Sequence, residues 1–255
     1  MPEPASMNAV AKSAKPAKPA KSVADPAPKP AAKPVKRDPA KTRAGILKAA
    51  VAEFSAKGYS GARTDQIAKR AKSNVRMIYH YFGGKDELYV CVLEEVLAKL
   101  RAEELQLDFS AIDPLEGVLQ MFDFINGHFA RHPELRHLLA FENLNRGQHL
   151  KRSTRIPEMA TPVLGLVARL IKRGEQSGAF RPGVDALQLY ITMVSLAYYS
   201  KSHAFTLSRI FEQDLASPEW QQAQQRQTHQ LLAAFLGKPA SASAPAPQPR
   251  SRKLK

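Results

Sequence analysis

The N-terminal fold is decided by the stretch Asn74-Val75-Arg76-Met77-Ile78-Tyr79-His80-Tyr81-Phe82, which Gly83-Gly84 follows. Asn74 is a residue type that caps helix N-termini, and the two glycines suit a helix end. Ile78 and Phe82 stand four residues apart, so they share one face of a helix and point toward a core. The stretch therefore predicts a short, capped helix with one buried face.

The flanking residues predict further short helices. Ile46, Leu47, Ala50, Val51 and Phe54 recur at helical spacing, and Gly58 follows at a C-terminal cap position. Thr64 can cap a second helix, whose inner face holds Ile67, Ala68 and Ala71. A break at Lys72-Ser73 precedes Asn74, and Lys85-Asp86-Glu87 opens the next helix. Three short helices, the last two joined by a tight turn, make a helix-turn-helix pattern.

Charge is distributed unevenly along the 255 residues, whose formal net charge is +15. Residues 1–40 and 237–255 each carry a net +5 and hold nine and four of the 19 prolines. Residues 41–90 carry +6, whereas 91–236 carry −1. Segments without a core-forming pattern stay disordered, so we expect basic tails at 1–40 and 237–255. A basic domain at 41–87 and a larger, nearly neutral domain at 88–236 lie between them.

The neutral domain also has a helical pattern throughout. An apolar stripe from Leu88 predicts a long helix to about Leu105. Prolines near the start of apolar-periodic segments then favour helices at about 114–131, 133–147, 156–178 and 218–236. A further helix is expected at about 185–211. No segment combines period-two alternation with hairpin turn signals. The predicted class is all-α, with a three-helix N-terminal domain and a C-terminal helical domain.

Composition excludes several classes of function. A single cysteine rules out a disulfide framework or an iron–sulfur cluster and fits a cytoplasmic location. No run approaches eighteen apolar residues, so no membrane partner is expected. The seven histidines look scattered, without zinc-ligand spacing, and no Gly-x-Ser-x-Gly elbow is present. We therefore expect no metal, no cofactor and no enzymatic activity, and the basic charge favours nucleic acid as the partner.

From Thr42 to Leu93 the sequence resembles the DNA-binding domain of the TetR/AcrR family of transcriptional regulators. The ordered series that carries the resemblance is Ile46-Leu47-Lys48-Ala49-Ala50, Phe54, Gly58-Tyr59, Ile67-Ala68, Ala71, Ile78-Tyr79-His80-Tyr81-Phe82 and Lys85-Asp86-Glu87-Leu88. The resemblance implies a sequence-specific homodimeric repressor that binds double-stranded operator DNA. A small-molecule effector would release it from the operator.

By this resemblance the helix from Asn74 to Phe82 is the recognition helix. Arg76 is the expected base reader, because its planar guanidinium matches guanine O6 and N7 in the major groove. The predicted DNA-binding residues, as base readers, thymine-methyl contacts or phosphate contacts, are Thr64, Asn74, Val75, Arg76, Met77, Tyr79, His80 and Lys85. Without the motif, an exposed arginine on a short helix is more often a solvated charge.

The turn departs from the family pattern. Lys72 and Ser73 stand where a glycine and an apolar residue are usual, and Arg76 stands where a small residue is common. If the turn needs a left-handed residue, Lys72 costs about 1–2 kcal/mol relative to glycine. Both changes add positive charge beside DNA, so we expect an altered operator preference, with binding retained.

An effector pocket is expected among the helices of the C-terminal domain, lined mainly by apolar groups. The candidates are Met121, Phe124, His128, Phe141, Glu142, Asn145, Arg146, Met193, Tyr198 and His203. The spacing of Glu142 and Arg146 permits an i,i+4 pair, which an ordinary surface salt bridge would also show. Met and aromatic residues at helical spacing are more often plain core.

The homodimer interface is expected on helices near 185–211 and 218–236. Residues 186–199 are apolar nearly all round, and a helix without a polar face must be covered on every side. The remaining alternative is an architectural, largely non-specific DNA-binding protein driven by its basic tails. Such a protein would not need a capped recognition helix.

Overall fold

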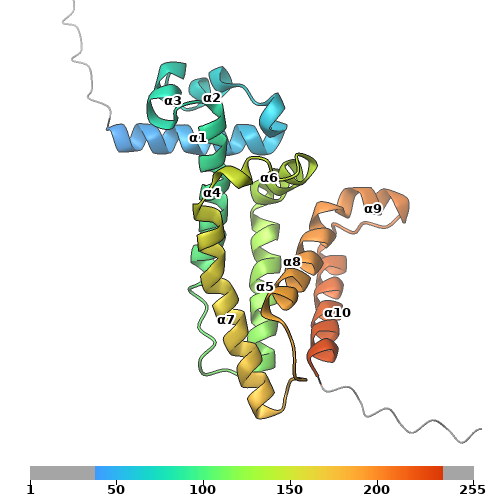
Figure 1. The fold of residues 1–255 in the computed structure, drawn as a ribbon. Helices are drawn as coiled ribbons and strands as arrows, with labels where there is room; N and C mark the ends of the chain where they lie inside the picture. Colours follow the sequence, from blue (N-terminus) through green and yellow to red (C-terminus); the bar gives the residue numbers. More distant parts are fainter. Residues whose placement is uncertain (1–37, 238–255) are drawn as a thin grey trace, which may run out of the picture. The chain divides into compact units, whose positions relative to one another are not determined.

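The computed structural model describes residues 38–237, and every regular element in that range is a helix (Figure 1). The all-α prediction is confirmed there. The predicted tails, apart from residues 38–40 and 237, lie outside the described residues. The helices are α1 Pro39–Gly61, α2 Thr64–Arg70, α3 Val75–Phe82, α4 Lys85–Glu104, α5 Pro114–Arg131, α6 Pro133–Leu144, the 3-10 helix η1 Leu150–Arg152, α7 Arg155–Ser177, α8 Ala186–Ser202, α9 Ala204–Ile210 and α10 Pro218–Leu236.

Helix α1 begins inside the range expected to be a tail. Asp38 caps it, because the Asp38 Oδ1 atom accepts a hydrogen bond from the Ala40 N–H at 2.9 Å, and Pro39 occupies the first turn. Gly58 interrupts the helix with φ 67° and ψ 179°, so regular helix geometry stops where the sequence predicts it. Ile46 and Phe54 are fully buried on the inner face of α1.

The two helical domains are joined through α4 and α6. Helix α1 packs on α2, α4 and α6, and α3 packs on α2 and α4. Helix α4 continues from the three-helix unit into the C-terminal domain, where it contacts α5, α6 and α7 (Figure 1). Helices α5, α7 and α8 pack against one another around Val118, Val167 and Leu189, each fully buried.

Two predicted helices of the C-terminal domain have different bounds. Helix α6 ends at Leu144 rather than near residue 147, because Arg146 (φ 56°) and Gly147 (φ 65°) turn the chain back. The range 185–211 holds two helices, α8 and α9, divided at His203. The helix stops there because the backbone of His203 leaves helical geometry, with φ −108° and ψ 3°. No helix in residues 38–237 is long and apolar enough to cross a bilayer.

Candidate nucleic-acid interface

Helix α3 is capped and two-faced as the sequence predicts. The Asn74 Oδ1 atom accepts a hydrogen bond from the Met77 N–H at 3.0 Å. Ile78 is fully buried and Phe82 nearly so. On the opposite side Tyr79 is 57% exposed, and Arg76 and His80 are exposed as well. The helix therefore presents a basic and aromatic outer face that the three-helix core holds in place.

The turn before α3 contains a residue in the left-handed conformation, the case considered for Lys72 from the sequence. Lys72 has φ 49°, and the Ser73 N–H donates to the Ala68 carbonyl oxygen at 2.9 Å, which closes the end of α2. A non-glycine residue in this region costs about 1–2 kcal/mol. The exposed side chains of Lys69 and Arg70 add positive charge beside the turn.

Other predicted DNA-binding residues are placed differently. Val75 and Met77 are only partly exposed and pack against the core. Thr64 does not cap α2: it is the first helical residue, and Arg63, whose side chain makes no capping bond, holds the cap position. Arg63 instead pairs with Asp65, with 3.0 Å between the Nε and Oδ1 atoms. That pairing lowers the pKa of Asp65.

Side chains at the start of α4 link the three-helix unit (α1 to α3) to the C-terminal domain. The Lys85 ammonium lies 4.7 Å from the centre of the Tyr59 ring. The Tyr59 hydroxyl donates to Asp86, and this bond raises the pKa of Tyr59 to about 12 and lowers the pKa of Asp86. Arg152, the last residue of η1, donates hydrogen bonds to Asp86 at 2.8 Å and to Glu87 at 2.7 Å.

The predicted effector residues of α6 do not form one group. Glu142 is buried and pairs with His149, with 2.8 Å between Glu142 Oε1 and His149 Nδ1. Its Oε2 atom accepts a hydrogen bond from the His149 backbone N–H at 3.2 Å. Arg146, the i,i+4 partner suggested by sequence, is exposed in the left-handed turn, and Asn145 is exposed at the helix end. Phe141 lies against Gly58 of α1. This part of α6 serves as a junction between the two domains.

The remaining effector candidates lie on α5 and α8. Met121 and His128 of α5 and Met193 of α8 are buried. Phe124 is half-buried, with its ring centre 5.8 Å from that of His128. Tyr198 is half-buried and donates to the Arg136 carbonyl oxygen at 3.3 Å, while His203 is exposed at the end of α8.

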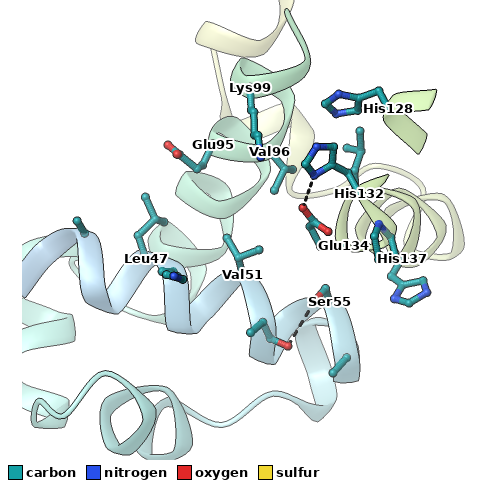
Figure 2. A pocket seen from close by; sticks show the side chains of 16 residues that line it. Leu47, Val51, Ser55, Glu95, Val96, Lys99, His128, His132, Glu134 and His137 are labelled. Carbon is teal, nitrogen blue, oxygen red and sulfur yellow. Dashed lines mark hydrogen bonds and ion pairs between the residues drawn. The ribbon is translucent and has the colours of Figure 1, made fainter. Parts of the chain in front are cut away.

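A cavity of about 770 Å³ lies where α1, α4 and α6 meet (Figure 2). Its lining includes Leu47, Val51, Ser55, Glu95, Val96, Lys99, His128, His132, Glu134 and His137. Of the ten predicted effector residues, His128 lines this cavity and the others do not. The cavity thus lies at the junction of the domains instead of deep between α5 and α8.

Sequence reasoning missed a histidine cluster beside this cavity. Glu103 of α4, His128 of α5 and His132 at the α5–α6 corner bring potential metal-ligand atoms within 4.8 Å of one another. The expectation that the histidines are scattered is therefore wrong here. The one available signal is the spacing His128-x₃-His132, which occurs in zinc sites.

A capped, outward-facing recognition helix after a tight turn, on a basic three-helix unit, defines a helix-turn-helix DNA-binding regulator. Family models agree with this class over both domains. The model described as bacterial regulatory proteins, tetR family, matches residues 46–91, and the model described as tetracyclin repressor-like, C-terminal domain, matches residues 114–232.

Known relatives are similar over most of their length. The chain is 37% identical to the HTH-type transcriptional repressor NicS of Pseudomonas putida over 179 residues, which cover 70% of this chain and 84% of that protein. It is 33% identical to the HTH-type transcriptional repressor SCO4008 of Streptomyces coelicolor, over 64% of this chain and 80% of that protein. A TetR-family regulator from Mesorhizobium loti shares the fold, with a TM-score of 0.59 at 19% identity over 78% of this chain and 97% of that one.

The chain belongs to the TetR family of bacterial regulatory proteins. It is a DNA-binding transcriptional repressor, and the alternative of an architectural DNA binder is not favoured.

Proposed function

We propose that α3 reads a specific operator in the major groove and that Arg76 is its main base reader. The observation that carries this proposal is the orientation of α3: Ile78 and Phe82 anchor one face in the core, so Arg76, Tyr79 and His80 stand on the other. An arginine held in this way can offer two parallel donors to one guanine.

Phosphate contacts would set the register of that helix. Thr64 at the start of α2 and Lys85 at the start of α4 flank α3, and Tyr79 and His80 lie on the exposed face of α3 itself. Hydroxyl, imidazole and ammonium donors at these positions, along with backbone N–H groups of α4, suit phosphate oxygens. The partly packed Val75 and Met77 would contribute apolar contacts to thymine methyl groups, and Asn74 would hold the first turn.

The experiment replaces Arg76 with alanine and measures binding to an operator fragment and to single-base variants of it. Arg76→Ala should relax the preference at one position in each half-site, with a loss of about 1–3 kcal/mol for the preferred base. Arg70→Ala is the matched control, because Arg70 is exposed at the end of α2. The control should weaken all sequences alike. If Arg76→Ala also weakens all sequences alike, Arg76 is a phosphate contact and the proposal is wrong.

The repressor works, in this proposal, as a homodimer through α8, α9 and α10. The large hydrophobic residues exposed on these helices are Leu187, Ile191, Tyr199, Phe205, Ile210, Phe211, Leu231 and Phe235. Exposed apolar side chains on three successive helices favour a protein interface, if a partner covers them together. A twofold axis through it would place two copies of α3 on the half-sites of a palindromic operator.

The test of the dimer is Ile191→Glu, measured by analytical ultracentrifugation. Ile191 is 51% exposed on α8, and a buried carboxylate at a twofold contact should shift the protein to monomers. Leu144→Glu is the control, because Leu144 is 81% exposed on α6, which is not one of the proposed interface helices, and the change should leave the dimer intact. A dimer unaffected by Ile191→Glu would exclude this part of α8 from the interface.

A small-molecule effector in the C-terminal domain would release the operator, and the cytoplasm is where such a repressor meets chromosomal DNA. The junction of α6 with α1 and α4 supports this view, because displacement of α6 would be transmitted to both helices. Compounds that raise the melting temperature should be tested for lower operator affinity. By linkage, operator DNA must then weaken compound binding by the same factor.

A further inference from the structure

We propose that Glu103, His128 and His132 bind a divalent first-row transition-metal ion such as Zn²⁺ at the corner between α4, α5 and α6. None of the three residues belongs to the helix-turn-helix unit. The proposal therefore stands or fails independently of operator reading by α3.

The geometry brings the donor atoms close to metal-binding distance. The His128 Nδ1 atom is 3.1 Å from Glu103 Oε2, and the ring centres of His128 and His132 are 4.3 Å apart. All three donor atoms lie within 4.8 Å of one another. Zinc ligands at bond lengths of 2.0–2.1 Å in a tetrahedron lie about 3.3 Å apart. Side-chain rotations that close about 1.5 Å or less would thus complete the site.

The donor set suits a transition metal. Two imidazoles and one carboxylate make up the protein ligands of known zinc sites and leave a position open for water. His132 also has an orienting partner: its Nδ1 atom lies 2.9 Å from Glu134 Oε1, and the dashed line in Figure 2 marks this contact. A carboxylate on one ring nitrogen fixes the tautomer and leaves the other nitrogen for the ion.

The surroundings provide both shielding and access. His128 is only 1% exposed, and the Glu103 side chain is 37% exposed. The cavity of Figure 2 reaches His128 and His132 from the side of α1 and provides a path for entry. Lys99 faces the same cavity and would repel a cation, but the two carboxylates of Glu103 and Glu134 offset its charge.

A bound ion would cross-link helices that are distant in sequence. Glu103 lies near the C-terminal end of α4, whereas His128 and His132 belong to the α5–α6 corner. Because an ion that binds only the folded protein stabilises it, Zn²⁺ should raise the melting temperature. At 100 times the dissociation constant, the expected rise is about 5–10 °C for a chain of this size.

The first experiment is a Zn²⁺ titration of the full chain in competition with a chromophoric chelator. The wild type should bind one ion per chain at this site. His132→Gln and Glu103→Gln should weaken binding about 100-fold or more, and Glu134→Gln about 10–100-fold. His137→Gln is the matched control, because His137 is an exposed histidine that lines the same cavity, and it should change nothing. Equal affinity in wild type and His132→Gln, or an equal loss in His137→Gln, would overturn the proposal.

A second measurement needs no variant. Co²⁺ in place of Zn²⁺ should give the intense visible absorption of a four-coordinate ion without a thiolate charge-transfer band, because the site holds no cysteine. A weak spectrum like that of the hydrated ion, a thiolate band from Cys91, or a melting temperature that Zn²⁺ does not raise would each refute the site.

Discussion

Gly58→Ala should destabilise the protein because Gly58 is both backbone-restricted and in close contact with another helix. Its φ of 67° and ψ of 179° fall in a region that is almost exclusive to glycine, at a cost of about 1–3 kcal/mol for other residues. A Cβ atom at this position would lie 2.9 Å from two ring carbons of Phe141, and overpacking of this kind adds about 1–3 kcal/mol. The expected total loss of unfolding free energy is about 2–6 kcal/mol.

A double-mutant cycle separates the two contributions. In a Phe141→Ala background the ring is gone, so Gly58→Ala should cost only the backbone part. The cycle should therefore show about 1–3 kcal/mol of coupling between the two positions. Gly45→Ala is the control on the same helix: its Cβ would meet nothing within 4 Å, so it should stabilise α1 by about 0.5–1 kcal/mol.

Urea denaturation followed by circular dichroism, at one fixed protein concentration, measures all four proteins of the cycle. Additivity within about 0.5 kcal/mol would refute the claim that α1 and α6 meet at Gly58 and Phe141. A Gly45→Ala variant as unstable as Gly58→Ala would show that α1 tolerates no added methyl group. The steric explanation would then be lost.

Two further predictions concern a helix cap and a buried ammonium. Asn74→Ala should cost about 1 kcal/mol in urea denaturation and Asn74→Ser much less, because the Oδ1 bond to the Met77 N–H caps α3; equal losses would exclude capping as the cause. Burial and the nearby Arg136 lower the pKa of Lys201 to about 8. The unfolded chain then binds more protons between pH 8 and 10.5, so stability should rise with pH in that window. Between pH 7 and 10.5 the unfolding free energy of the wild type should rise relative to that of Lys201→Met by up to about 3 kcal/mol. If the difference between the two unfolding free energies does not change with pH, Lys201 is not buried as the structure shows.

Local signals in the sequence were sufficient for α5 and α10. Residues 114–131 and 218–236 are predicted with the observed bounds, because Pro114 and Pro218 mark the first turns. Asp113 and Ser217 accept the capping hydrogen bonds there. The break at His203 had no such signal, since neither glycine nor proline stands there, and the non-helical backbone of His203 became visible only in the structure.

Contacts between distant segments could not be predicted in the same way. Glu103 and His128 are 25 residues apart, and their approach depends on how α4 packs beside α5. The Glu142–His149 pair depends on the early end of α6, which Arg146 and Gly147 produce with positive φ angles. Single-residue propensities do not predict such a turn, because a left-handed arginine is uncommon.

The segment from Phe141 to Arg152 is the physical link between the three-helix unit and the C-terminal domain. The Arg152 bonds to Asp86 and Glu87 are half-exposed, and ion pairs of that kind contribute little stability. The Glu142–His149 pair is buried, and it fixes the path of the chain that delivers Arg152 to α4. Because Phe141 at the other end of the segment contacts Gly58, displacement of α6 must act on α1 and α4 together. The rigidity of this junction therefore comes from the buried pair and the glycine contact, and the surface ion pairs determine where it meets α4.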